Sequence, residues 1–306
     1  MSTTIRIGTR ASVLARTQTQ TIADALQGRG VTVEIVPMTS DGDRTRASLS
    51  SLGGAGVFAA GLRTALLEGR CDAVVHSLKD LPTTPHPGLV VAATPDREAA
   101  EDVLCARDGM TITSLPKGAV IGTGSPRRAA QIRMARADLQ VRDIRGNIDT
   151  RMGFVRDGEL DAVVLAAAGL HRTDRTDAIT QTLPLEVWPT APGQGALAVE
   201  IRESDAESGT ELYEAVRSVH NAQVWDAVTA ERAVLARLEA GCAAPVGAHG
   251  TVSDGVLNVS AAAYHPTERA FFTARGQAPV ASATELGADL ATQLLQSGAS
   301  EWLPTT

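Results

Sequence analysis

Short apolar runs alternate with helix-like stretches along the first part of the chain. Apolar residues recur with a period of two in the runs, which is typical of strands, and with a period near 3.6 in the longer stretches. The pattern predicts strands at Thr4–Ile7, Val31–Val36 and Asp72–His76 and helices at Ser12–Gln27 and Phe58–Glu68. This order of elements favours an α/β lobe.

A second lobe repeats this plan. The fragment Gly8-Thr9 recurs as Gly122-Thr123, and Asp72-Ala73-Val74-Val75 recurs as Asp161-Ala162-Val163-Val164. We therefore expect two similar α/β lobes facing a cleft, with ligands beyond the carboxyl ends of the strands. The predicted elements are strands Ala119–Ile121, Val141–Ile144 and Asp161–Leu165 and helices Pro126–Ala137 and Ile148–Arg156.

Polar breaks predict where the chain crosses between lobes, and its last part changes character. With Ala196–Ile201 as a returning strand, we expect domain 1 at residues 1–95 and 196–212 and domain 2 at residues 100–191. An acidic linker, Glu203–Glu211, leads to domain 3 at residues 213–306. That domain is predicted to be α+β, with helices Tyr213–His220, Asp226–Glu239 and Ala283–Gln296 and strands His249–Ser253, Val256–Tyr264 and Ala270–Arg275.

The composition excludes several classes of protein. Twenty-eight basic residues stand against 35 acidic ones, a formal net charge of −7, whereas a general nucleic-acid binder is basic. We expect no signal peptide and no membrane span. Three cysteines at unrelated spacings argue against a disulfide framework, and six histidines show no metal-ligand spacing. We expect a cytoplasmic protein without a metal.

Positive charge is concentrated in glycine-flanked turns. In Gly122-Thr123-Gly124-Ser125-Pro126-Arg127-Arg128, Ser125 can cap a helix whose free N–H groups, with both guanidinium groups, would bind an anion. The alternative is an ordinary capped helix with two solvated arginines. A similar turn carries Arg145 and Arg151, for which simple exposure is the alternative.

Two further segments contain residues with possible chemistry. Lys79 and Asp80 stand side by side after an apolar strand, where the acid could stabilise a cation or move protons. The alternative is a surface salt bridge, and the neighbouring His76 is expected to be structural. Cys242, in a turn after a helix, is a candidate nucleophile or attachment point, whereas Cys71 and Cys105 look like buried filler.

Together these motifs resemble the porphobilinogen deaminase (hydroxymethylbilane synthase) family over nearly the whole chain. Their joint occurrence in one order is specific, although each motif alone is weak. The matching segments are Gly8-Thr9-Arg10-Ala11-Ser12 through Gln18, Val75–Pro82, Gly122–Arg128 with Gln131, Arg145-Gly146-Asn147 to Arg151, Ala168–Arg172, Pro192-Gly193-Gln194-Gly195, and Glu231-Arg232 leading to Gly241-Cys242.

The resemblance implies a three-domain enzyme whose first two domains look like periplasmic binding-protein lobes. It implies a dipyrromethane cofactor joined by a thioether to Cys242. Four porphobilinogen molecules are condensed head to tail on this primer with loss of ammonia, and water releases the tetrapyrrole. Asp80 would hold the pyrrole nitrogens and stabilise the cation left by deamination. The implied binding residues are Arg10, Ser12, Ser77, Lys79, Ser125, Arg127, Arg128, Arg145, Arg151, Arg172 and Gln194.

One loop departs from the family pattern. Where the family commonly reads GGKGLFVKELE, residues 53–62 contain no lysine, because both lysine positions are alanine. We expect this loop to close without those ion pairs, and Arg63 is a candidate to replace part of the lost charge. The core chemistry is not affected by this change.

Two other functions remain open from the sequence. A non-catalytic two-lobed small-anion binding or sensor protein would suit the lobes, but it leaves the third domain and Cys242 without a role. A folded but inactive deaminase is the other alternative. For the enzyme we expect porphobilinogen and the growing oligopyrrole as partners, no nucleic acid or membrane, and a monomer.

Overall fold

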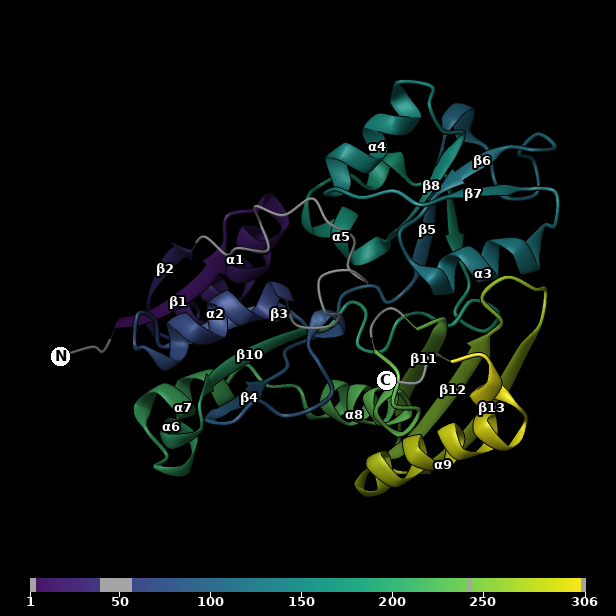
Figure 1. Ribbon diagram of the computed structural model, residues 1–306. Coiled ribbons are helices and arrows are strands. Elements are labelled where there is room, and N and C mark those ends of the chain that lie inside the picture. The colour runs from purple at the N-terminus through teal and green to yellow at the C-terminus, as the bar shows by residue number, and fades with distance from the viewer. Residues whose placement is uncertain (1–3, 39–56, 242–243, 304–306) are drawn as a thin grey trace. The chain divides into compact units, whose positions relative to one another are not determined.

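The computed structural model describes residues 4–38, 57–241 and 244–303. The chain divides into two compact units. Unit 1 combines Met1–Glu98 with Ala196–Trp225, and unit 2 combines Ala99–Gly195 with Asp226–Thr306. Sheet 1 belongs to unit 1, whereas sheets 2 and 3 belong to unit 2 (Figure 1).

Sheet 1 has five strands in the order β2-β1-β3-β10-β4. Both β2 and β3 run parallel to β1, and β10 runs antiparallel to its neighbours β3 and β4. The predicted strands of the first lobe are confirmed, whereas β4 lies where no element was predicted. The strands are β1 (Thr4–Arg10), β2 (Thr32–Met38), β3 (Ala73–Ser77), β4 (Leu89–Ala93) and β10 (Leu197–Arg202).

Helices α1 (Val13–Gln27) and α2 (Val57–Leu67) cover opposite faces of sheet 1. Ala73 and Val75 of β3 pack with the α1 core, whereas Val74 packs with the α2 core. This division follows from the pleat, because successive residues of a strand point to opposite faces. The expected linker Glu203–Glu211 was wrong, since it contains α6 (Glu203–Glu207) and the first residue of α7 (Glu211–Arg217).

Sheet 2 has the same plan, with the order β7-β6-β8-β5-β9. Strands β7 and β8 run parallel to β6, and β5 runs antiparallel to β8 and β9. The predicted similarity of the two lobes is therefore confirmed. The elements are β5 (Asp102–Ala106), β6 (Val120–Gly122), β7 (Gln140–Arg142), β8 (Ala162–Ala166), β9 (Gln181–Leu183), α3 (Pro126–Ala135), α4 (Ile148–Arg156) and α5 (Ala167–Arg172).

The repeated Asp-Ala-Val-Val fragments occupy equivalent places. Asp72, just before β3, accepts a hydrogen bond from Arg6 N of β1 at 2.9 Å. Asp161, just before β8, accepts one from Val120 N of β6 at 2.7 Å. Each carboxylate thus joins the amino ends of two parallel strands in its own sheet.

Sheet 3 is an antiparallel meander of β11 (Val246–Ser253), β12 (Val256–Tyr264) and β13 (Phe271–Pro279). Helix α9 (Ala283–Gln296) lies along this sheet in Figure 1. Its apolar residues share one core with the strands and with α8 (Ala222–Arg237). This smaller sheet domain confirms the α+β prediction for the last part of the chain.

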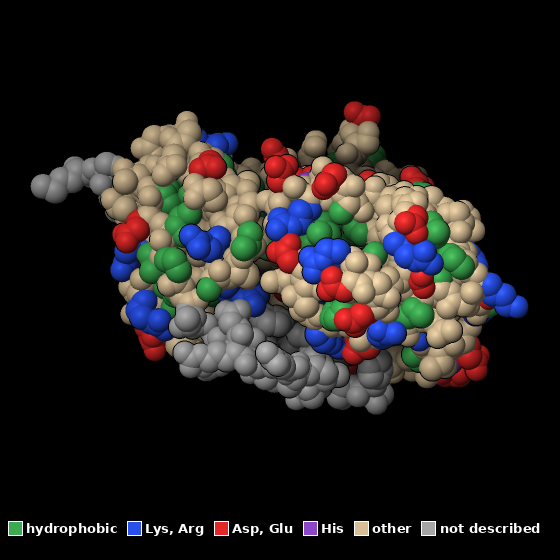
Figure 2. Space-filling view, turned by 90° about the horizontal axis from the view of Figure 1, so that it is seen from above, with side chains coloured by type: hydrophobic (Ala, Val, Ile, Leu, Met, Phe, Trp, Pro, Cys, Tyr) green, Lys and Arg blue, Asp and Glu red, His purple; other side chains and the backbone are tan. Residues whose placement is uncertain are grey.

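Short 3₁₀ helices complete the described chain, and its surface carries both signs of charge. On the face shown in Figure 2, basic and acidic side chains are interspersed. No helix within residues 4–38, 57–241 and 244–303 is long and apolar enough to cross a membrane. The 3₁₀ helices are η2 (Leu78–Asp80), η3 (Arg107–Gly109), η4 (Thr176–Ala178), η5 (Val280–Ser282) and η6 (Ala299–Glu301).

Candidate active site

Five predicted site residues lie at the carboxyl edge of sheet 1. Arg10 is the last residue of β1, and Ser77 is the last residue of its parallel neighbour β3. Ser12 caps α1, because its Oγ accepts a hydrogen bond from Ala15 N at 3.3 Å. Lys79 and Asp80 follow in the short helix that begins at Leu78, the residue after Ser77. The sheet therefore brings two cationic side chains, two hydroxyls and one carboxylate to one edge of unit 1.

The turn that carries Asp80 is held firmly by its neighbours. Leu78 and Leu81 are buried, whereas Asp80 between them is exposed. Leu78 N donates to Ala196 O at 3.0 Å, and Leu81 N donates to Leu78 O at 3.1 Å. The acid thus projects from a short turn whose apolar residues anchor it in the core.

Behind this turn lies a buried polar cluster. His76, on β3, has its Nε2 3.1 Å from Glu200 Oε2 on β10. Arg63, on α2, donates from Nε to Oε2 at 2.9 Å and from Nη2 to Oε1 at 2.7 Å. His76 is buried as expected, but its Nε2 makes no hydrogen bond to the described residues and contacts Glu200 only as an ion-pair partner. The suggestion that Arg63 replaces lost charge in the loop was wrong, because its guanidinium is buried on Glu200.

The charge of Glu200 is stabilised by its partners. Burial by itself raises the pKa of a carboxyl group, since it removes the charged form from water. Here the contacts with His76 and Arg63 outweigh burial and lower the pKa of Glu200 to about 2. The carboxylate therefore stays ionised within the core.

In unit 2, Ser125 caps α3 as predicted, with Oγ 3.4 Å from Arg128 N. The two arginines, however, are neither solvated nor open at the turn. Both are buried on Asp102, the first residue of β5, which is itself 0% exposed. Arg127 Nη1 lies 2.8 Å from Asp102 Oδ2, and Arg128 Nη2 lies 2.6 Å from Oδ1. Their part in ligand binding stays a prediction.

The predicted site residue Gln194 belongs to this buried network. Its Nε2 donates to Asp102 Oδ1 at 2.9 Å, and its Oε1 accepts from Arg128 at 3.3 Å. Trp188 Nε1 also donates to Asp102, at 3.1 Å. Burial would raise the pKa of Asp102, but Arg127 and Arg128 lower it far below its usual range. The carboxylate therefore stays ionised beside two cations.

The remaining predicted arginines follow other strands of sheet 2. Arg145 lies in the turn after β7, 3.3 Å from Asp143, and Arg151 donates from α4 to Gly146 O at 2.8 Å. Arg172, at the end of α5, donates to Gly195 O at 2.7 Å. All three are partly buried. Because β6, β7 and β8 are parallel, these turns share the carboxyl edge of sheet 2 with Ser125.

Glycine is required where two of these turns meet. A Cβ on Gly124, in the turn after β6, would lie 2.7 Å from Ile144 O, in the turn after β7. That is closer than carbon and oxygen normally approach. The main chains of the two turns therefore touch at this point, next to Arg145.

The two cysteines that the structure describes match the expectation of buried filler. Cys71 and Cys105 are free and buried, and burial raises the pKa of Cys105 to about 12. A thiol of that kind is a poor nucleophile at neutral pH, so the filler interpretation is confirmed. Cys242 lies outside the described residues, between Gly241 and Ala244.

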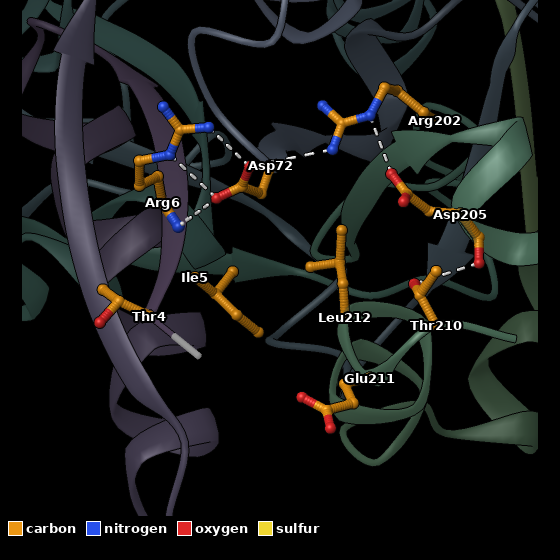
Figure 3. A pocket seen from close by; sticks show the side chains of 9 residues that line it. All are labelled: Thr4, Ile5, Arg6, Asp72, Arg202, Asp205, Thr210, Glu211 and Leu212. Carbon is orange, nitrogen blue, oxygen red and sulfur yellow. Dashed lines mark hydrogen bonds and ion pairs between the residues drawn. The ribbon is translucent and has the colours of Figure 1, made fainter. Parts of the chain in front are cut away.

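A pocket of about 540 Å³ lies at the other end of sheet 1 (Figure 3). It is lined by the amino-terminal part of β1, by Asp72, and by residues after β10. Arg6 pairs with Asp72 at 2.8 Å, and Arg202 pairs with Asp205 at 2.8 Å. Glu211 adds a further negative charge to the lining, and none of the predicted site residues lines the pocket.

Asp102 and Glu200 were not predicted from the sequence as members of the buried polar clusters. Each stands in or beside an apolar run, where a carboxylate is costly unless a cation neutralises it. A carboxylate within an apolar run was therefore a signal that a buried cation must lie beside it. It would not have identified the partners, because Arg127 is 25 residues from Asp102 and Arg63 is 137 residues from Glu200.

Comparison with known proteins decides the family. The model "Porphobilinogen deaminase, dipyromethane cofactor binding domain" matches residues 5–210, and "Porphobilinogen deaminase, C-terminal domain" matches residues 225–296. The chain belongs to the porphobilinogen deaminase family. The resemblance drawn from the sequence motifs is confirmed.

Relatives match this porphobilinogen deaminase family member over nearly its full length. The porphobilinogen deaminase of Leifsonia xyli is 52% identical and covers 98% of this chain and 94% of its own. That of Thermobifida fusca is 48% identical, with coverage of 98% and 96%. Among solved structures, a periplasmic substrate-binding protein of an ABC transporter from Coxiella burnetii aligns with a TM-score of 0.45 at 15% identity, covering 70% of this chain and 91% of that one.

Proposed function

We propose that the protein is a transferase that condenses four porphobilinogen molecules head to tail and, with water, frees hydroxymethylbilane. At each addition the aminomethyl C–N bond of the substrate breaks and ammonia leaves. The match of both family models, which together span most of the chain, carries this proposal. The exposed Asp80 on its fixed turn supports it, because this chemistry needs an acid at the reacting pyrrole.

The residues of this chain fit a dipyrromethane cofactor. Every pyrrole of such a group carries an acetate and a propionate, so it needs several cationic and hydroxyl partners. Unit 1 offers Arg10, Lys79, Ser12 and Ser77 at one sheet edge. In unit 2, two guanidinium groups face the single carboxylate of Asp102, which leaves a formal charge of +1. When bound, the cofactor supplies the pyrrole carbon to which the first substrate is added.

Asp80 is the proposed catalytic residue. Its carboxylate accepts hydrogen bonds from pyrrole N–H groups, and its negative charge stabilises the positive charge that develops as ammonia departs. It can also take up the proton released when the new carbon–carbon bond forms. The neighbouring Lys79 binds a carboxylate rather than taking part in this proton movement.

The other predicted residues bind the acid side chains of cofactor and substrate. Planar guanidinium groups suit carboxylates because they donate two parallel hydrogen bonds. Arg127 makes its hydrogen bonds to described residues through Nη1. The proposed set in unit 2 is Ser125, Arg127, Arg128, Arg145, Arg151, Arg172 and Gln194.

Cys242 is the proposed attachment point of the cofactor, through a thioether. We further propose that the enzyme acts as a monomer in the cytoplasm and binds neither nucleic acid nor membrane. The acidic net charge of −7 supports the absence of a nucleic-acid partner. Sedimentation of the purified protein tests the oligomeric state.

Intact-mass measurement tests cofactor attachment. We expect the wild-type protein to exceed its sequence mass by one dipyrromethane and to give a colour with an aldehyde reagent for pyrroles. Cys242→Ala is expected to lack both signals. Cys71→Ala, at a buried thiol, is the matched control and should keep both. Wild-type protein without the added mass would contradict covalent attachment.

A second experiment separates the enzyme from an anion sensor and from an inactive deaminase. We expect purified protein to consume porphobilinogen, and Asp80→Asn to keep the cofactor mass while kcat falls by about 100-fold or more. Full cofactor loading without any turnover in the wild type would favour the inactive deaminase. Reversible carboxylate binding with no pyrrole signal would favour the sensor.

A further inference from the structure

Two neighbouring residues at the end of β3 are held from opposite faces of sheet 1. On the α1 face, Gln18 Nε2 donates to Ser77 Oγ at 2.8 Å. On the α2 face, His76 contacts Glu200, which binds Arg63. The turn with Asp80 begins at the next residue, so both contacts act directly on the base of that turn.

The contact on the α2 face is the more unusual one. The side chains of Arg63, His76 and Glu200 are 8%, 6% and 3% exposed, and they come from three different elements. The register places Ala198 opposite His76 and Glu200 opposite Val74. Glu200 therefore lies two residues further from the end of β3 than His76, on the same face of the sheet. His76 therefore reaches back along the strand to the carboxylate, while Arg63 approaches it from the helix above.

Stability alone is a weak reason for such a cluster. Taking two charges out of water costs several kcal/mol per ion, and well-packed apolar residues of similar volume often stabilise a protein at least as well. Apolar residues already fill this face, since Leu62, Leu66 and Val74 pack together here. What the cluster adds is direction, because the electrostatic contact of the imidazole with the carboxylate at 3.1 Å favours one placement of the ring, which apolar packing does not.

We propose that His76, Glu200 and Arg63 are positioning residues for Asp80. The Arg63–Glu200 pair fixes the imidazole of His76, and His76 fixes the end of β3 from which the catalytic turn starts. A shift of about 1 Å in a reacting group can cost up to about 100-fold in rate, so a loose strand end would lower turnover without removing any binding group. This inference rests on the proposed function and extends it by three residues.

The decisive variants change His76 and leave the ion pair between Arg63 and Glu200 intact, which preserves folding. His76→Leu removes the contact to Glu200, and His76→Gln retains a donor at nearly the same place. We expect kcat to fall about tenfold in His76→Leu, KM for porphobilinogen to stay within about twofold, and His76→Gln to recover most of kcat. If His76 only stabilised the fold, kcat would not fall separately from KM in His76→Leu, and His76→Gln would not recover kcat.

Hydrogen exchange gives a second readout that does not depend on turnover. The amides of Leu78 and Leu81 are protected by hydrogen bonds to Ala196 O and Leu78 O. We expect both to exchange faster in His76→Leu than in the wild type or in His76→Gln, in protein with and without the cofactor. The double variant Arg63→Met/Glu200→Leu removes both charges together and should give the same faster exchange.

Asp72→Asn is the matched control, because it weakens an ion pair at the opposite end of the same strand. It should leave kcat and the two amides unchanged. Unchanged kcat and unchanged exchange in both His76→Leu and the double variant would overturn the positioning role while the proposed function stands. Wild-type turnover by Asp80→Asn, or a wild-type protein without pyrrole, would instead refute the proposed function itself.

Discussion

Each lobe buries a carboxylate on the corresponding strand of its sheet, but the two carboxylates have different partners. Glu200 lies on β10, the antiparallel neighbour of β3, and Asp102 lies on β5, the antiparallel neighbour of β8. Glu200 is paired with one guanidinium and one imidazole, whereas Asp102 is paired with two guanidinium groups. The shared position shows that both lobes tolerate a buried acid at this strand.

Depth and charge distinguish the two sites. Glu200 is opposite Val74, within β3, whereas Asp102 is opposite Ala166, the last residue of β8. The charges of Glu200 and Arg63 cancel, so the first cluster can act only through the shape of the strand end. The second cluster retains a formal charge of +1 at the sheet edge. In the proposed function, one lobe therefore positions an acid, and the other supplies positive charge for acidic ligands.

The largest effect on stability is expected from Asp102→Asn. This change leaves two buried guanidinium groups without a counter-charge, and breaking a buried pair typically costs about 3–5 kcal/mol. Urea unfolding followed by circular dichroism measures the free energy of unfolding. Glu200→Gln, which leaves a single buried guanidinium, should cost less. Equal losses in the two variants would contradict the difference drawn between the lobes.

Acid should remove the contribution of Glu200 to stability. Its folded pKa of about 2 lies below its ordinary value of 4.5, so the stabilisation is complete above that ordinary value and is lost as pH falls toward about 2. At about pH 3 the loss amounts to about 2 kcal/mol. Arg63→Met/Glu200→Leu lacks this titration. Its free energy of unfolding should therefore decline less than that of the wild type between about pH 5 and about pH 3.

A smaller effect is expected from Gly124→Ala. The added Cβ would lie 2.7 Å from Ile144 O, so the turns after β6 and β7 must separate. Overpacking of this kind typically costs about 1–3 kcal/mol. Thermal unfolding and KM for porphobilinogen measure the two consequences, since the shift also moves Arg145. Gly153→Ala is the control, because Gly153, like Gly124, lies outside the positive-φ glycines, and its Cβ position meets other atoms only at 3.6 Å or more.

The smallest effect is expected from Asp72→Asn. Arg6 is 41% exposed, so solvent screens its ion pair with Asp72. The amide oxygen of asparagine can still accept the bond from Arg6 N. We expect a loss below about 1 kcal/mol in the free energy of unfolding. A loss as large as that of Asp102→Asn would show that solvent exposure does not determine how much an ion pair of this protein contributes to the free energy of unfolding.

The sequence was sufficient for elements whose apolar pattern is local. The strand that ends at Gly122 and the helix that follows it were predicted because an apolar run, a capping serine and a proline stand close together. Strand β5 was missed because it begins with Asp102, which makes the segment look like a polar break. That acid is tolerated only because Arg127 and Arg128 neutralise it, and no local pattern records a contact between distant residues.

The candidate site was predicted in part for the same reason. The sheet topology explains why Arg10 and Ser77 share an edge, since β1 and β3 are parallel neighbours. The direction in which a side chain turns from its helix is not encoded so locally. Arg127 and Arg128 were expected to face an anion at the turn, and instead they turn inward to Asp102.

The aspartates before β3 and β8 have a consequence for how such a protein can change over time. Each secures the starting end of its strands with the same side-chain-to-amide bond, at 2.9 Å in one half and 2.7 Å in the other. Strand register is thereby set at a distance from the loops at the carboxyl ends of the strands. Substitutions can accumulate in those loops, and recognition can diversify between the two halves, while the scaffold keeps its alignment.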